Sequence, residues 1–185
     1  MKRSIKVLFI LLVGSLLSSV YFGVTAYTVG STSKKLHALT TRELTLDPQT
    51  KREGCRVQQS MPDHACTPGA IIGTATKDEI CTPGYSKSVR DVSAVTKKQV
   101  YAEYGITHHE PGEYEVDHMI SLELGGSNDI SNLFPEAASP FPGFHEKDEV
   151  ENFLHAQLCN SELTLPEAQG LINDHWVEVY HVVHE

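Results

Sequence analysis

The sequence lacks an excess of positive charge, and it also lacks long low-complexity segments after its first third. Its 185 residues carry 15 Lys+Arg against 24 Asp+Glu, a formal net charge of −9. Such a surface repels phosphate at long range, which disfavours tight, non-specific binding to duplex DNA. Screening confines this repulsion to about 8–10 Å at physiological salt, so a local site where a metal meets a phosphate is still permitted. Hydrophobic content of 40% and aromatic content of 8% suit a globular protein.

The N-terminus has the pattern of a targeting segment. Lys2, Arg3 and Lys6 precede an apolar run that extends to about residue 24, and Val24–Ala26 suits cleavage by signal peptidase. We therefore predict a signal peptide over residues 1–26. The apolar run is long, so an uncleaved membrane anchor is the alternative. In both cases the body of the protein is exported, periplasmic or secreted, and cleavage would leave it without a stable membrane partner.

Cysteine is scarce, and no C-x-x-C pair occurs. An even number of cysteines in an exported chain predicts two disulfides, in any of three pairings, among the following residues: Cys55, Cys66, Cys81 and Cys159. Structural zinc on these thiols is the weaker alternative, because zinc sites typically use closely paired cysteines.

We divide the exported part into a polar leader, residues 27–65, and a folded domain, residues 66–185. The motif CTPG occurs at Cys66–Gly69 and again at Cys81–Gly84. Because Thr-Pro-Gly is typical of turns, we expect two disulfide-anchored turns there.

Several patterns predict an α+β fold. Thr96 and Gln99 suggest a capping box for a helix that stops at Gly105. The segment YEVDHMI alternates as a strand, with Asp117 and His118 on opposite faces. The segment ELGGSNDISNLF then reverses the chain into a second strand near Leu133. Two helices follow, one from His145 and one opening at TLPE, where Thr164 and Glu167 form a capping-box pattern.

Asp117 and His118 have the chemistry of a metal-assisted hydrolytic site. A neutral imidazole can take a proton from water near neutral pH, and a neighbouring carboxylate can hold a divalent cation. His145, at a helix start, is placed to be the second metal ligand. Asn132 can hydrogen-bond across the turn and fix the loop that carries His118. This combination suits hydrolysis of phosphodiesters.

The segment VDHMISLELGGSNDISNL…FHEK resembles the HNH endonuclease motif. The resemblance implies a ββα-metal finger with flanking helices, here stabilised by disulfides, in which His118 is the general base and Asn132 orders the loop. Asp117 and His145 would hold one divalent metal ion, which could be magnesium, manganese or zinc. His155 is a rival for the helix ligand, less favoured because it neighbours the core-facing Leu154.

The resemblance is strong from Glu113 to about Asp148, and looser from Cys66 to about Tyr180. Small exported bacterial HNH-like proteins also share the CTPG and GYSKSVR segments. Within the latter, Arg90 is a candidate phosphate contact, or else it pairs with Asp91. The zinc-binding cysteine pairs of many HNH proteins are missing here, and the disulfides are expected to take their place.

The predicted function is that of a metal-dependent endonuclease acting on DNA or RNA, and the sequence does not define its oligomeric state. Two alternatives belong to other classes. One is a degenerate HNH fold that binds a partner without catalysis, which the acidic composition favours. The other is an exported metal-binding protein that uses its ten histidines, including His181 and His184.

Overall fold

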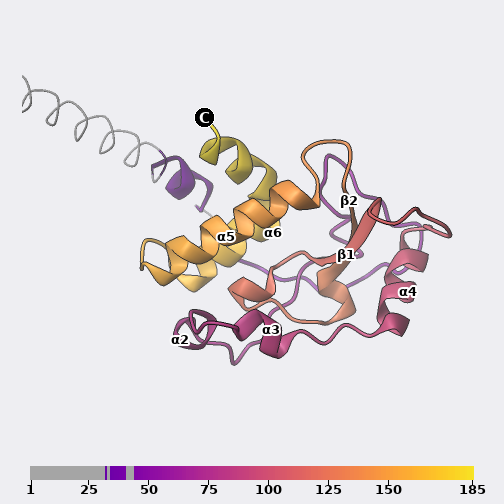
Figure 1. The fold of residues 1–185 in the computed structure, drawn as a ribbon, viewed down its shortest axis with the longest axis horizontal. Coiled ribbons are helices and arrows are strands. Elements are labelled where there is room, and N and C mark those ends of the chain that lie inside the picture. Colours follow the sequence, from indigo (N-terminus) through magenta and orange to yellow (C-terminus); the bar gives the residue numbers. More distant parts are fainter. Residues whose placement is uncertain (1–31, 33, 41–43) are drawn as a thin grey trace, which may run out of the picture. The chain divides into compact units, whose positions relative to one another are not determined.

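The computed structural model describes residues 32, 34–40 and 44–185, and the chain divides into two compact units, Met1–Ala38 and Leu39–Glu185 (Figure 1). In the first unit, residues 34–38 are helical. The predicted signal peptide, residues 1–26, lies outside the described residues. Within the described part of the chain, none of the helices combines the length and the apolar character that crossing a membrane requires.

The second unit has the α+β composition that the sequence predicts. Short helices come before a β-hairpin, and two long helices follow it. In chain order the elements are α2 (Lys77–Ile80), α3 (Tyr85–Val89), α4 (Ala94–Glu103), β1 (Tyr114–His118), the 3-10 helices η1 (Leu122–Leu124) and η2 (Ile130–Asn132), β2 (Leu133–Ala137), α5 (Phe144–Cys159) and α6 (Leu165–Val183).

The hairpin is a two-stranded antiparallel sheet in which Asp117 pairs with Phe134 and His118 with Leu133. Since side chains alternate along a strand, Asp117 and His118 point to opposite faces. The second strand begins where the sequence predicts but extends to Ala137. Pro135, Glu136 and Ala137, which open the proline-rich segment PEAASPFPGF, are therefore part of the sheet.

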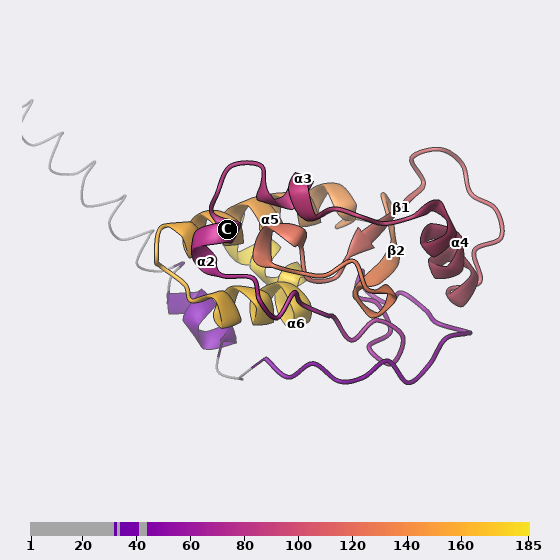
Figure 2. The ribbon, with the colours of Figure 1, turned by 90° about the horizontal axis from the view of Figure 1, so that it is seen from below.

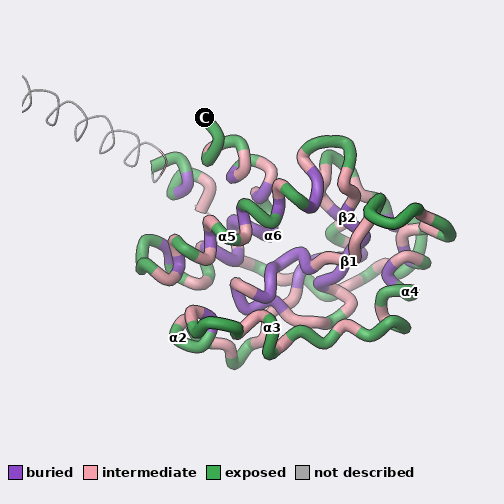
Figure 3. Tube along the Cα trace, in the orientation of Figure 1, coloured by how far each residue is buried: buried purple, intermediate pink, exposed green. Residues whose placement is uncertain are grey.

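The core lies between the hairpin turn and the two long helices. Helix α5 packs along α6, and α4 packs against both strands (Figures 1 and 2). Figure 3 shows buried chain in the hairpin region and along parts of α5 and α6. The largest fully buried apolar side chains are Trp176, Phe134, Ile80, Met119, Ile120, Leu122, Leu124, Leu133, Leu154, Leu158 and Leu171. Burying this surface is the main source of stability for the unit.

Helix starts follow local capping chemistry, with one correction. The capping box of Thr164 and Glu167 at the start of α6 is confirmed. The one expected at Thr96 and Gln99 is wrong, because the hydroxyl of Ser93 accepts a hydrogen bond from the backbone N–H of Thr96 and α4 begins at Ala94. A serine three residues earlier therefore satisfies a free N–H of the first turn.

The four cysteines form two disulfides, Cys55–Cys66 and Cys81–Cys159. This confirms the expected pair of bridges and selects one of the three pairings. The first bridge, together with the hydrogen bond from the Gln49 side chain to the carbonyl of Cys66 (2.9 Å), ties the preceding segment down. Residues 44–65, which the sequence suggests as a leader, accordingly lie within the second unit.

Candidate functional site

His118 is the last residue of β1 and exposes only 2% of its surface. Its Nε2 lies 3.1 Å from Oδ1 of Asn128 in the hairpin turn. Asn128 donates through Nδ2 to the carbonyl of Val89 (2.7 Å), and its Oδ1 also accepts from the N–H of Asp91 (3.2 Å). The amide oxygen therefore faces the imidazole, so Nε2 is the protonated nitrogen of the neutral ring. The lone pair is left on Nδ1, where a base would act.

Burial lowers the pKa of His118, and this effect outweighs the opposing pull of the Asp117 carboxylate and the Asn128 hydrogen bond. The positive charge of Arg90 lowers the pKa further. His118 is consequently neutral at pH 7. Neutrality and a fixed tautomer are two properties that a histidine general base needs.

Asn132 uses its whole side-chain amide to hold the turn. Its Oδ1 accepts from the backbone N–H groups of Ile120 (2.9 Å) and Ala70 (3.2 Å). Its Nδ2 donates to the carbonyls of Ile120 (2.9 Å) and Ser127 (2.9 Å). The fully buried side chain thus bridges the end of β1, the turn and the segment after Cys66. These bonds across the turn are the kind that the sequence suggested for Asn132.

The Gly-Gly pair allows two segments of the backbone to approach each other closely inside this turn. Gly125 ends η1 with φ +77°, a left-handed conformation that glycine adopts without strain. Gly126 donates its N–H to the carbonyl of Ser121 (2.9 Å), and a Cβ on Gly126 would overlap the carbonyl oxygen of Ile120. The second position therefore requires glycine for space rather than for its φ angle.

The opposite face of the hairpin meets a buried lysine of α5. The Lys147 ammonium, with no exposed surface, donates to Asp117 Oδ2 (2.6 Å), to the carbonyl of His118 (2.8 Å) and to Glu151, one turn further along the helix. These bonds use all three of its N–H donors. Lys147 thereby fixes both the Asp117 carboxylate and the backbone that carries His118.

Three carboxyl groups surround this single ammonium. Burial raises the pKa of Glu151 to about 7, and it raises the pKa of Glu136 well above its usual range. For Lys147, burial lowers the pKa, but the attraction of Asp117, Glu151 and Glu136 outweighs it and raises the pKa. The same ammonium lowers the pKa of Asp117 against the effect of burial. At neutral pH, Lys147 and Asp117 form the ion pair and Glu151 titrates, and the raised pKa of Glu136 shifts that group toward its neutral form.

Glu136 is the least satisfied member of this cluster. It exposes 1% of its surface, no N–H or hydroxyl group among the described residues donates to it, and its side-chain hydrogen bond is with the Asp117 carboxylate. A buried carboxyl group with so few partners is costly, because folding removes its water and replaces only part of those hydrogen bonds. The cluster thus has a surplus of hard oxygen donors over cations.

The structure brings together Asp117, His118 and Asn132, and Arg90 lies close enough to influence the His118 charge while remaining exposed. His145 is also exposed, on the first turn of α5, where its ring stacks near Phe144 with centroids 4.3 Å apart. Among the described residues, the hydrogen bonds and ion pairs between Asp117 and α5 do not include His145. Lys147 makes that contact.

Four residues of the site were not identified from the sequence: Asn128, Glu136, Lys147 and Glu151. Asn128 lies in a glycine-rich segment, where asparagine is common in turns for local reasons. The spacing of Lys147 and Glu151, four positions apart on a helix, is a detectable signal of an ion pair. It does not by itself reveal that the pair is buried against Asp117.

Comparison of the chain with protein-family models, with curated proteins and with solved structures found no match.

Proposed function

We propose that the protein is a metal-dependent endonuclease that hydrolyses phosphodiester bonds of DNA or RNA, with β1, β2 and α5 acting as a ββα-metal finger. The observation that carries this proposal is the state of His118. Its ring is neutral, its Nε2–H is held by Asn128, and its Nδ1 retains the lone pair. The resemblance of the surrounding sequence to the HNH motif supports the same assignment.

In the proposed reaction, Nδ1 of His118 takes a proton from water as the water oxygen attacks the phosphorus. Asn128 keeps the other ring nitrogen protonated, and the Asp117 carboxylate stabilises the imidazolium that forms. Asn132 keeps the loop that supports the base in one conformation. Arg90, which is exposed and close enough to lower the pKa of His118, would bind a phosphate of the substrate in a bidentate manner.

The donor set of the site fits a divalent cation. Asp117, Glu136 and Glu151 place three carboxyl groups around one ammonium, and no N–H or hydroxyl group among the described residues donates to Glu136. Oxygen donors of this kind suit magnesium or manganese, and imidazole also suits zinc. Asp117 and His145 are the residues proposed to hold the ion. A bound metal would neutralise charge on the scissile phosphate and on the leaving oxygen.

Two observations favour a second candidate, a protein with an HNH-like fold that binds a partner without catalysis. Lys147 already supplies a cation to Asp117. His118 exposes only 2% of its surface, which restricts the approach of a substrate. An acidic protein of this kind would bind a partner through another surface.

The test is cleavage of plasmid DNA and of RNA by the oxidised protein with magnesium, manganese or zinc, and with EDTA. His118→Ala should lower the rate by about 10²–10⁴-fold, the usual contribution of a general base. His108→Ala is the matched control, because the side chain of His108 is 85% exposed and should not affect the rate.

Equal loss in both variants, or cutting that persists in EDTA, would contradict the proposed mechanism. If folded, metal-loaded wild type cuts neither substrate, the binding-only candidate is favoured. Fluorescence anisotropy with labelled oligonucleotides would then measure whether nucleic acid is still a partner.

A further inference from the structure

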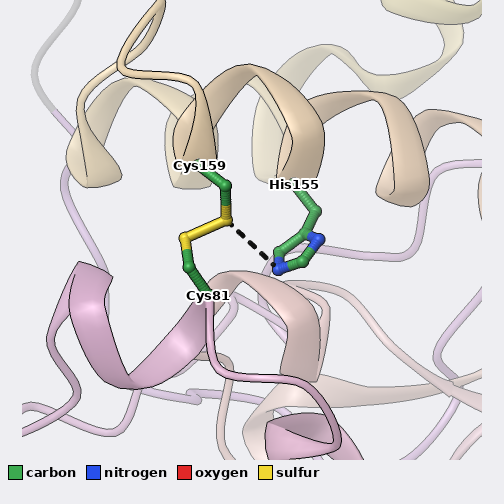
Figure 4. A group of neighbouring side chains, drawn as sticks. All are labelled: Cys81, His155 and Cys159. Atoms are coloured by element: carbon green, nitrogen blue, oxygen red, sulfur yellow. Dashed lines mark hydrogen bonds between the residues drawn. A yellow bond between two sulfur atoms is a disulfide. The ribbon is translucent and has the colours of Figure 1, made fainter.

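A second group of chemically reactive side chains, Cys81, His155 and Cys159, lies where the C-terminal part of α5 meets the end of α2 (Figure 4). Cys81 follows the last residue of α2, whereas His155 and Cys159 lie four positions apart on α5. One ligand atom from each residue lies within 4.8 Å of the other two. Positions i and i+4 share one face of a helix, so α5 presents the imidazole and the sulfur together.

In the oxidised protein these two cysteines are joined, and their sulfurs are not available as thiolates. Nε2 of His155 lies 3.5 Å from Sγ of Cys159 and 3.3 Å from the carbonyl oxygen of Ile80. All three side chains are half-buried, so a reductant and a metal ion can reach them from solvent. The covalent bond therefore keeps both sulfurs of this group from binding a metal ion.

We propose that reduction of the Cys81–Cys159 disulfide creates a binding site for one thiophilic divalent cation of the Zn²⁺ class. A dithiol reductant supplies two electrons and two protons, the S–S bond breaks, and the dithiol becomes a disulfide. Binding of the cation then releases one proton from each protein thiol. The two thiolates balance the charge of the ion, and Nε2 of His155 is the neutral third ligand.

The observed geometry fits a tetrahedral ion. With metal–sulfur distances of about 2.3 Å and metal–nitrogen distances of about 2.0–2.1 Å, the nitrogen–sulfur edge of the tetrahedron is about 3.5 Å. The contact between His155 and Cys159 already has this length, 3.5 Å. The two sulfurs would separate to about 3.8 Å, the sulfur–sulfur edge of the same tetrahedron. Three protein ligands leave a fourth position for water.

The imidazole must present the lone pair of Nε2 to the ion, so its proton has to be on Nδ1. The contact of Nε2 with the Ile80 carbonyl is then replaced by the bond to the metal. In the part of the chain that the structure describes, metal binding would break the hydrogen bonds of His155 with Cys159 and Ile80 and no others.

Other contacts keep the ligands near one another after reduction. Lys77, at the start of α2, donates to the hydroxyl of Ser161 (2.5 Å), just beyond the end of α5. Ile80, adjacent to Cys81, is buried with 2% exposure. Helices α2 and α5 therefore remain in contact without the covalent bond. This site involves neither Asp117 nor His118, so the inference does not depend on the proposed nuclease function.

The experiment titrates Co²⁺ into the full-length protein after reduction with a water-soluble phosphine, which adds no thiolate of its own. Reduced wild type should bind one equivalent and develop thiolate-to-cobalt charge transfer together with the visible bands of a tetrahedral ion. Zn²⁺ should displace the cobalt. The oxidised protein should show no such absorption.

Variants assign the ligands. His155→Ala should weaken Co²⁺ binding by more than about 100-fold, because even loss of a residue that only supports a ligand costs 10–100-fold. His181→Ala, an exposed histidine on α6, should bind as wild type does. The double variant Cys81→Ser/Cys159→Ser retains the other cysteine pair and should lose the charge-transfer band.

A second readout uses wild type alone. Bound Zn²⁺ should protect Cys81 and Cys159, but not the other pair, from alkylation in the reduced protein, as located by mass spectrometry. Absence of the cobalt bands, equal affinity in His155→Ala, or alkylation unaffected by zinc would overturn the proposal. The same holds if reduction abolishes the helical circular dichroism and added Zn²⁺ does not restore it.

Discussion

Replacement of Lys147 by methionine removes the single cation from a buried group of carboxyls while retaining most of the apolar stem. In the native protein the ammonium satisfies Asp117, Glu151 and the carbonyl of His118, and it has no exposed surface. Breaking a buried ion pair by deleting one partner costs about 3–5 kcal/mol, because the other charge remains buried without compensation. Against a total stability of about 5–15 kcal/mol, this is a large loss.

The loss should depend on pH in a defined direction. Without the ammonium, the carboxyls of Asp117 and Glu151 have higher pKa values when folded than when unfolded, so the folded state binds more protons. A group with a raised folded pKa contributes stability below its unfolded pKa and loses it as the pH rises through the folded value. For Glu151, whose pKa is already about 7 in the native protein, the window runs upward from its ordinary value of 4.5. The variant should therefore be most destabilised at alkaline pH.

Urea unfolding followed by far-UV circular dichroism, at about pH 5.5 and about pH 8, measures both effects. We expect Lys147→Met to lose about 3–5 kcal/mol at the higher pH and distinctly less at the lower. Lys97→Met, on the exposed surface of α4, is the control and should stay within about 0.5 kcal/mol of wild type. A cost of Lys147→Met below about 1 kcal/mol, or one equal at both pH values, would refute the reasoning.

Four further predictions concern the base and its turn. Because burial lowers the pKa of His118 below 6.5, the acid limb of kcat/KM for nucleic acid cleavage should lie below pH 6.5, and a limb above that value would contradict the assignment. Asn128→Ala should lower kcat/KM by about 10–100-fold, measured in the same assay, because the ring loses the partner that fixes its tautomer. Asn132→Ala leaves buried backbone groups without partners and should cost about 3 kcal/mol or more in urea unfolding, and a cost under about 1 kcal/mol would show that water replaces them. Gly126→Ala should prevent folding or lower Tm sharply, whereas Gly73→Ala, where a Cβ meets nothing within 4 Å, should leave Tm nearly unchanged.

Local patterns in the sequence predict the hairpin and the three longer helices, α4, α5 and α6, because the signals are themselves local, but they did not predict the short helices α2 and α3. Alternation over Tyr114–His118 and the Gly-Gly reversal predict the strand and its turn. Thr164 and Glu167 mark the start of α6 because the capping hydrogen bonds join residues three apart. The start of α4 was missed because two capping candidates, Ser93 and Thr96, occur in one turn, and sequence alone does not rank them.

The charged cluster could not be predicted in the same way, because its contacts join distant segments. Lysine is rarely fully buried, so a Lys147 without exposed surface contradicts the ordinary expectation for a helix-surface residue. Glu136 lies in a strand only because the pairing of β1 and β2 extends past Pro135. Asn128 reaches His118 through a turn whose path depends on Asn132 and on the glycine pair. Each of these contacts is set by tertiary structure.

The two candidate functions differ in which residue of α5 acts on Asp117. Residues two apart on an α-helix are separated by about 200° around its axis, so His145 and Lys147 project from different faces of α5. Lys147 and Glu151 lie on the face of α5 that contacts Asp117. His145 is exposed beside the acidic side chains of Glu115 and Asp148. A metal ion held by Asp117 and His145 must therefore bind at the solvent edge of the cluster and share Asp117 with the ammonium. If the ammonium alone neutralises Asp117, His118 has a buried ion pair beside it and no electrophile to assist it, and binding without catalysis is the function that follows.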